Sequence, residues 1–277
     1  MATPCEVLLE LDDAGEARAV AESVARSAWR VEDRFSRYRT DNIVQAINTS
    51  AGKPVIVDDE TANLLDFAAT LHELSGGLFD ITSGVLRRAW VFDGHARLPA
   101  RDDIEALLPL VGWHKVSWRR PVLTLLPDMQ LDFGGIGKEY AVDQAIAAVR
   151  RDFPVSCLIN FGGDLAISHP RQQGLAWRVG VESATGPTSS AAAMIDLYRG
   201  ALATSGDTHR FILSDGRRYT HILDPRTGWP VEHAPRSVTV CAATCTDAGM
   251  LTTMALLHGS RAAEFLESAG VRHWIQH

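Results

Sequence analysis

Four segments of the chain carry glycine, acidic, hydroxyl and basic side chains at spacings that could bind a phosphate-containing ligand. One of them, LDFGGIGKEYAVD (131–143), places Lys138 after a run of glycines and just before an expected helix. Glycines let main-chain N–H groups approach an anion, and a helix N-terminus favours negative charge. Because the spacing matches neither GxxxxGK[ST] nor GxGxxG, an anion site and a plain tight turn both remain open here.

A second segment combines ATSGDTHRF (203–211) with YTHILDPRTGWPV (219–231). Its Thr204 and Ser205 hydroxyls and the guanidinium of Arg210 could bind a phosphate. Asp-Pro and Thr-Gly are turn dipeptides, so His221 stands either in a binding turn or in a structural hairpin. The other two segments are FSRYRTDNIVQAIN (35–48) with GGLFDITSG (76–84), and NFGGDL (160–165).

The hydrophobic pattern indicates the elements that must position these segments. Apolar residues at helical spacing, from Val20 to Phe35, predict a helix over 14–35, and the paired glycines Gly76 and Gly77 end a helix over 59–74. Further helices are expected near 101–109, 136–151, 247–258 and 260–269, with a surface loop at 183–193. Strands are expected at 4–11, 114–119, 121–126, 129–133, 155–160, 176–182, 192–198, 209–213, 218–223 and 237–242.

Several of these strands follow one another without intervening helices, which predicts an α+β fold with a mostly antiparallel sheet. Since no linker divides the chain, we expect one domain over residues 1–277.

Composition excludes several classes of protein. The hydrophobic content of 46% and the charged content of 22% are typical of a packed globular protein. A net charge of −7 disfavours electrostatic binding of nucleic acid. No apolar run is long enough for a transmembrane segment, and the first residues lack the pattern of a signal peptide.

Taken together and in this order, the motifs FSRYR, GLFDITSG, DFGGIGKEYAVD, NFGGD, ATSGD and HILDPRTGWPV resemble the ApbE family of FAD:protein FMN transferases. The resemblance implies a single T-fold-like α+β domain. It also implies one reaction, in which FAD is cleaved with Mg²⁺, FMN passes to a Ser or Thr hydroxyl of an acceptor flavoprotein subunit, and AMP leaves.

The resemblance also implies roles for individual residues. Lys138, His221 and Asp247 are the expected catalytic residues, and Gly135, Asp247 and Thr253 the expected ligands of Mg²⁺. The expected FAD-binding residues are Met1, Tyr38, Phe79, Asp80, Asp132, Lys138, Ser205, His221, Ile222, Asp224 and Thr227.

One departure from the family pattern concerns the metal. The last family motif reads A-D-A-L-x-T, and counting back from Gly259 places its Thr on Thr253 but its Asp on Gly249. Asp247 lies two residues earlier, about 200° around a helix, so it is either the N-cap of that helix or a ligand at an irregular helix start. If Gly249 replaces the acid, we expect weak Mg²⁺ binding, which Gly249→Asp strengthens without loss of stability.

Three functions are compatible with these residues: an FMN transferase, an FAD-binding protein without transfer, and an FAD pyrophosphatase that releases FMN and AMP to water. An enzyme is favoured because Lys138, Thr253 and the HILDPRTG turn are all present. The expected location is the cytoplasm for the sequence as given, or the periplasm if an export segment lies outside it.

Overall fold

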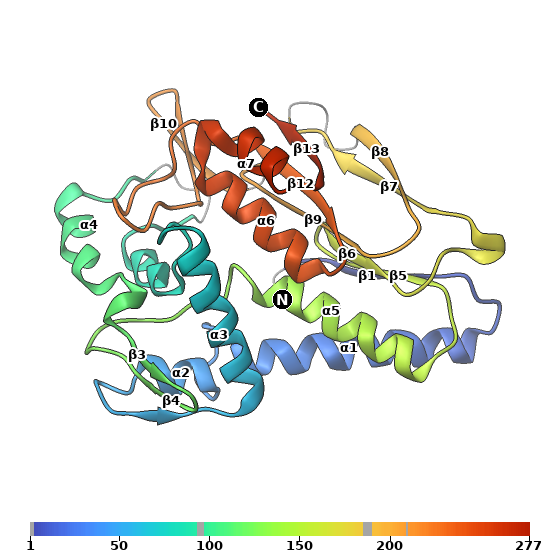
Figure 1. The fold of residues 1–277 in the computed structure, drawn as a ribbon, viewed down its shortest axis with the longest axis horizontal. Coiled ribbons are helices and arrows are strands. Elements are labelled where there is room, and N and C mark those ends of the chain that lie inside the picture. The colour runs from blue at the N-terminus through green and yellow to red at the C-terminus, as the bar shows by residue number, and fades with distance from the viewer. Residues whose placement is uncertain (1–2, 93–96, 185–189, 209) are drawn as a thin grey trace.

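A six-stranded antiparallel sheet forms the centre of the molecule (Figure 1). The computed structural model describes residues 3–92, 97–184, 190–208 and 210–277. The strand order is β1-β5-β6-β9-β12-β13, and each neighbouring pair is antiparallel. These strands are β1 (Cys5–Leu9), β5 (Cys157–Phe161), β6 (Asp164–Ile167), β9 (Ala201–Gly206), β12 (Ser237–Ala242) and β13 (Arg272–Gln276). The predicted α+β class is therefore confirmed.

Both faces of the sheet are covered. In β5, Cys157 and Ile159 belong to the main core on the helix side, whereas Leu158 belongs to a second cluster beneath the hairpin of β7 (Trp177–Glu182) and β8 (Ala191–Leu197). Successive side chains of a strand point to opposite faces, so an apolar run such as Cys157–Leu158–Ile159 suits a strand covered on both sides.

Three long helices pack together on the helix side: α1 (Ala14–Phe35), α5 (Gly137–Asp152) and α6 (Cys245–Leu257). Helix α1 begins after Asp13, whose carboxylate accepts from Glu16 N at 2.7 Å. Its predicted apolar positions, from Val20 to Phe35, are buried. Helix α5 contacts α6 and strand β6, and α6 contacts strands β6 and β9 (Figure 1). Helix α7 (Ala262–Ser268) follows α6.

Further helices, a small sheet and a hairpin gather at the other end of the molecule (Figure 1). They are α2 (Ile43–Asn48), α3 (Asp59–Leu74), α4 (Arg101–Leu107), the 3₁₀ helix η1 (Ile81–Arg88), the sheet of β2 (Val55–Ile56), β4 (Val122–Thr124) and β3 (Ser117–Arg119), and the hairpin of β10 (Phe211–Ser214) and β11 (Arg217–Thr220). Trp90 is buried there, and its indole stacks on Phe92 and meets Trp229 edge-on.

The expected strand at 129–133 is wrong. The main-chain N–H and carbonyl of Leu131 bond the side-chain amide of Asn48, and Asp132 N donates to Ile81 O. The segment therefore runs extended without a strand partner. The sequence interpretation also missed α2, η1 and the short strands β2, β6, β9 and β13.

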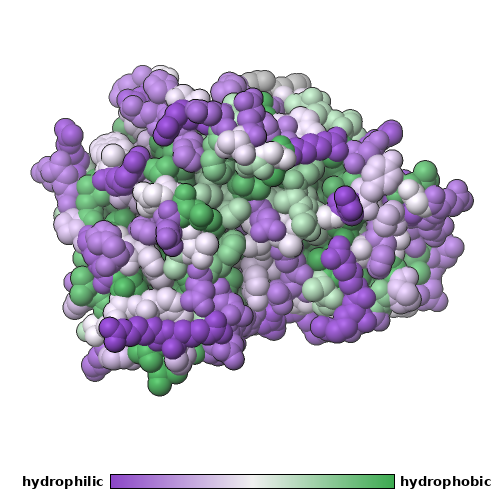
Figure 2. All heavy atoms as spheres, in the orientation of Figure 1, coloured by the Kyte–Doolittle hydropathy of each residue, from purple (hydrophilic) through white to green (hydrophobic). Residues whose placement is uncertain are grey.

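The surface facing the viewer is hydrophilic over most of its rim, and apolar residues gather towards its middle (Figure 2). In the part of the chain that the structure describes, no helix is long and apolar enough to cross a membrane.

Candidate functional site

The start of α5 brings the glycine-rich turn onto the central sheet. Ile136 N and Gly137 N both donate to Phe133 O, which closes the turn. Lys138 then lies in the first turn of the helix, and its Nζ is 2.7 Å from Asp164 Oδ2. Asp164 is only 1% exposed. This ion pair joins the DFGGIGK segment to the NFGGD segment, two of the motifs that the sequence singled out.

Asp164 owes its position to the β5–β6 turn. Gly162 and Gly163 both have positive φ, of +63° and +96°, and Gly163 N donates to Asn160 Oδ1. The left-handed conformation favours glycine, which explains the two glycines before the acid. At its other oxygen, Asp164 accepts from Thr204 N at 3.0 Å, so the ATSGD segment joins the same cluster.

Hydroxyl groups continue this cluster onto α6. Ser205 Oγ lies 2.8 Å from Thr252 Oγ1, and Thr252 Oγ1 donates to Gly249 O at 2.9 Å. Ser205, an expected FAD-binding residue, therefore links β9 to the helix that carries the expected metal motif.

Glu139 closes the cluster from the α5 side, and the sequence interpretation did not single it out. Its side chain is 6% exposed, and Oε2 has no hydrogen-bond partner. It lies directly against Gly249: a Cβ added there would be 2.4 Å from Glu139 Cγ and 3.1 Å from Oε1. The expectation that Gly249→Asp leaves stability unchanged is therefore wrong, because Glu139 already fills the space that the new side chain needs.

The electrostatics of this cluster follow from burial. Burial and the neighbouring charge of Asp164 raise the pKa of Glu139 to about 8. Burial alone lowers the pKa of Lys138, but the attraction of Asp164 and Glu139 outweighs it and the pKa is raised. Burial, with Asp164 and Glu139 nearby, also raises the pKa of the Cys245 thiol. The lysine is thus held charged between two carboxyls, and because it pairs with Asp164 at 2.7 Å, Glu139 is the carboxyl whose pKa is raised.

A second group of residues surrounds Asp132. Its carboxylate lies 2.9 Å from Arg37 Nη1 and 3.3 Å from Arg87 Nε, and it accepts from Gly134 N. It therefore fastens the FSRYR segment and η1 to the glycine turn. Tyr38, next to Arg37, is 76% exposed and leaves an aromatic ring available to a ligand.

Phe79 and Asp80 are buried in this structure. The Phe79 ring lies against Gly135, where an added Cβ would be 3.2 Å from Cε2. Asp80 caps η1: Oδ1 accepts from Thr82 N and Oγ1, and Oδ2 accepts from Trp113 N. Both residues support the glycine turn and η1, and their expected contact with FAD stays a prediction.

In the HILDPRTG turn, His221 is held by a main-chain carbonyl. Its Nδ1 lies 3.0 Å from Arg210 O. Because a carbonyl only accepts, Nδ1 carries the proton and Nε2 is left as an acceptor. Burial, with the charges of Arg210 and Arg87 nearby, lowers the pKa of His221 to about 4, so the imidazole is neutral at pH 7.

The rest of this turn is held by local bonds. Asp224 pairs with Arg226 at 2.7 Å, and its carbonyl accepts from Thr227 N and Gly228 N. Gly228 O in turn accepts from the buried Trp90 indole. Thr227 is exposed, whereas Ile222 packs against the core. The turn is thus anchored underneath with its polar edge outward.

Helix α6 begins at Cys245, two residues earlier than expected. Its N-cap is Thr244, which accepts from Asp247 N, and Asp143 of α5 accepts from Cys245 N and Thr246 N. The interpretation of Asp247 as the N-cap is therefore wrong: it lies within the regular first turn. Gly249 and Thr253 are four residues apart and share a face of α6, and Asp247 projects to another side.

Several of the expected site residues thus fall into groups. Lys138 and Ser205 lie in the buried cluster, Asp132 pairs with Arg87, and the charge of Arg87 also acts on His221. Met1 lies outside the described residues. The sequence interpretation missed Arg37, Arg87, Glu139 and Asp164 as site residues, although Glu139 adjoins Lys138 and Asp164 ends the NFGGD motif.

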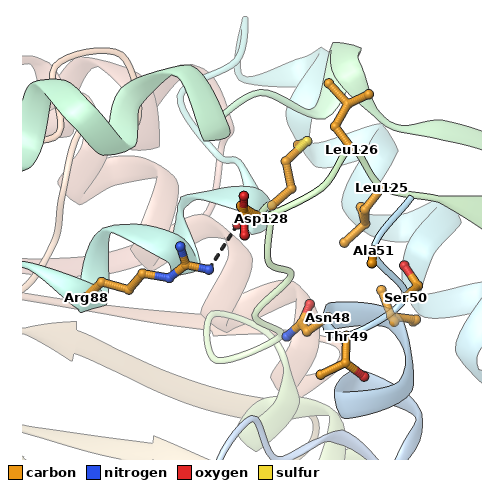
Figure 3. A pocket seen from close by; sticks show the side chains of 10 residues that line it. Asn48, Thr49, Ser50, Ala51, Arg88, Leu125, Leu126 and Asp128 are labelled. Atoms are coloured by element: carbon orange, nitrogen blue, oxygen red, sulfur yellow. Dashed lines mark hydrogen bonds between the residues drawn. The ribbon is translucent and has the colours of Figure 1, made fainter. Parts of the chain in front are cut away.

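Within the described ranges, no three His, Cys, Asp or Glu side chains form a group that could hold a metal ion. A cavity of about 180 Å³ lies apart from the clusters above, between the end of α2 and residues 125–129 (Figure 3). Arg88 reaches across it to Asp128 O at 3.0 Å. None of the expected site residues lines it.

Comparison with known proteins finds curated relatives along most of the chain. The chain is 31% identical over 265 residues to an FAD:protein FMN transferase of Treponema pallidum, covering 89% of this chain and 73% of that protein. It is 27% identical over 249 residues to the Vibrio cholerae enzyme of that name, covering 88% and 75%.

Solved structures of two related proteins have the same fold as this chain. The ApbE protein of Thermotoga maritima superposes with a TM-score of 0.88 at 31% identity, covering 99% of this chain and 90% of that one. The flavin transferase ApbE of Vibrio cholerae gives 0.85 at 25% identity, with the same coverage. The family model described as the ApbE family matches residues 1–275. The chain therefore belongs to the ApbE family.

Proposed function

We propose that this protein is an FAD:protein FMN transferase that moves FMN from FAD to a Ser or Thr hydroxyl of an acceptor protein, releases AMP and depends on Mg²⁺. The observation that carries the proposal is the joining of distant motifs. Lys138 pairs with Asp164, Asp164 accepts from Thr204 N, and Ser205 bonds α6. Curated relatives that match 88% and 89% of this chain bear the name FAD:protein FMN transferase.

The reaction forms a bond between the acceptor oxygen and the phosphorus of the FMN half of FAD. The bond from that phosphorus to the bridging oxygen breaks, and AMP leaves with the bridging oxygen. The hydroxyl proton passes to a base. Such a reaction needs mainly positioning of the reacting groups and neutralisation of phosphate charge.

The chain offers groups for both tasks. Lys138 remains charged beside Asp164 and has further N–H donors for a phosphate oxygen. Arg87, which pairs with Asp132 and helps to lower the pKa of His221, adds a guanidinium. His221 is neutral with Nε2 as an acceptor, so it can accept a hydrogen bond or a proton, and we assign it to the nucleotide side of the reaction.

The donor atoms of this region fit Mg²⁺. They are oxygens: the main-chain carbonyl of Gly135, the hydroxyl of Thr253, and a buried carboxylate oxygen of Glu139 that lacks a partner. Mg²⁺ prefers oxygen ligands and is commonly held by one or two carboxylates together with substrate phosphates. When bound, the ion would neutralise charge on the pyrophosphate.

The flavin ring needs an apolar or aromatic cover. Tyr38 supplies an exposed ring beside Arg37, which stands 6.0 Å from the ring centre. We propose that the isoalloxazine stacks there, with the pyrophosphate toward Lys138.

The test mixes the purified protein with FAD, MgCl₂ and an acceptor domain of a flavinylated redox subunit. AMP is followed by chromatography, and covalent flavin by in-gel fluorescence. We expect both products, and loss of covalent flavin when the acceptor Ser or Thr is changed to Ala. AMP without an acceptor would indicate a pyrophosphatase, and FAD binding without AMP would indicate a binding protein; either result refutes transfer.

A further inference from the structure

The carboxyl group of Glu139 is buried where α5 meets α6, next to a second buried acid, Asp164. Glu139 Oε2 is buried without a hydrogen-bond partner. The nearest ionisable groups are Asp164, Lys138 and the thiol of Cys245. Two carboxyls therefore share one lysine, and that lysine lies 2.7 Å from Asp164.

A buried acid without a partner needs either a proton or a cation. Hydroxyl and main-chain oxygens lie close by on α6, where Thr252 bonds Gly249 O and Ser205. Thr253 is on the same face of α6 as Gly249, one helical turn further. Gly135, the expected main-chain ligand, lies four residues before Glu139 in the chain, in the turn that precedes α5. The surroundings thus contain the oxygen ligands that a hard cation takes.

The contact with Gly249 shows which helix supplies the acid. At position 249 a side chain has no room, because its Cβ would be 2.4 Å from Glu139 Cγ. The carboxylate of Glu139 reaches from α5 into the space where an α6 side chain would start. The acidic side chain at this point can therefore come from α5 or from α6, but not from both helices at once.

We propose that Glu139 is the carboxylate ligand of the divalent cation in this protein, provided from α5 beside Gly249 of α6. This proposal rests on the Mg²⁺ dependence of the proposed function. It replaces the expectation that the metal site has lost its acid. One carboxylate, combined with a hydroxyl, a carbonyl and substrate phosphates, is a sufficient set for Mg²⁺.

The test measures binding of Mn²⁺, a paramagnetic substitute, to the full chain with FAD present, by the loss of the free-ion EPR signal. Glu139→Gln keeps the shape of the side chain but removes its charge, so the dissociation constant for Mn²⁺ should rise about tenfold or more. Glu267→Gln, at an exposed position of α7, is the matched control, and its Mn²⁺ affinity should equal that of the wild type.

A second variant, in which the carboxylate comes from α6 instead of α5, tests the same proposal by a gain of binding. Glu139→Gly combined with Gly249→Asp removes the steric conflict and supplies the acid from α6, and Mn²⁺ binding should return to within about threefold of the wild type. Gly249→Asp alone keeps the conflict and should lower the melting temperature. Circular dichroism melts of each variant check the fold.

The proposal would be overturned if Glu139→Gln bound Mn²⁺ as tightly as the wild type, or as tightly as the double variant Glu139→Gly with Gly249→Asp. Either result would leave the proposed transfer intact. Absence of Mn²⁺ binding in the wild type, or AMP release that needs no divalent cation, would overturn both. A buried acid with only a structural role would alter the melts and leave Mn²⁺ binding unmoved.

Discussion

Replacing Lys138 by alanine should destabilise the protein itself, before any ligand is considered. Asp164 is 1% exposed, and its charge is paired with Lys138 Nζ at 2.7 Å. Removing one partner of a buried ion pair costs about 3–5 kcal/mol, since the remaining charge stays buried. A third of the Lys138 side chain is exposed, so water can enter the space, and we expect about 2–3 kcal/mol.

The assay is urea unfolding at pH 7.5 without FAD or metal, followed by tryptophan fluorescence and circular dichroism to check for a single transition. Lys138→Ala combined with Asp164→Asn should recover at least half of the loss. Asparagine removes the charge but keeps an oxygen to accept from Thr204 N. Lys53→Ala, at an exposed position, is the control and should lie within about 0.5 kcal/mol of the wild type. A Lys138→Ala protein as stable as the wild type would refute the reasoning.

Three further outcomes follow from the same structure. The pKa of His221 is about 4 in the folded protein, below its ordinary value of about 6.5. Between these two pH values the unfolded chain binds more protons than the folded protein. The stabilisation that is present above pH 6.5 is therefore lost as the pH falls towards 4. That loss is at most about 3 kcal/mol, and His221→Gln should reduce it in unfolding curves taken between pH 4 and 7. Tyr38→Ala should leave the melting temperature unchanged, because the ring is exposed, and weaken FAD binding in a fluorescence titration; unaltered FAD affinity would remove Tyr38 from the flavin site. Thr244→Ala should cost about 1 kcal/mol of stability through the lost N-cap, whereas Asp247→Asn should not, and equal losses in urea unfolding would contradict the assignment of the cap.

Local signals in the sequence were sufficient for the long elements. The bounds of α1 and α3 agree with the predicted 14–35 and 59–74, because caps and apolar spacing lie within the helices themselves. The strand at 129–133 failed because strand pairing depends on a neighbour, and Asn48 takes the main-chain bonds of Leu131 instead. The sequence analysis missed β6 because it has only four residues, and β9 because its second half consists of Thr204, Ser205 and Gly206 rather than apolar residues.

The candidate site divides in the same way. The sequence motifs were sufficient to select Lys138, Asp132 and His221 as candidate site residues, because turn-forming residues and the order of motifs can be read from the sequence. The burial of Glu139 against Gly249 and the pairing of Lys138 with Asp164 could not be read there. Both depend on which face of α5 meets α6 and the sheet, a matter of packing between segments far apart in sequence.

The sequence by itself thus determined the α+β class, the family and the segments that bear the chemistry, since periodicity, capping and motif order are local properties. Only the tertiary structure decided which acid is left without a partner and which helix supplies it. The physical reason is that the charge state and partners of a buried group depend on what the fold packs around it, and in this protein α6 has no side chain at Gly249 where Glu139 of α5 enters.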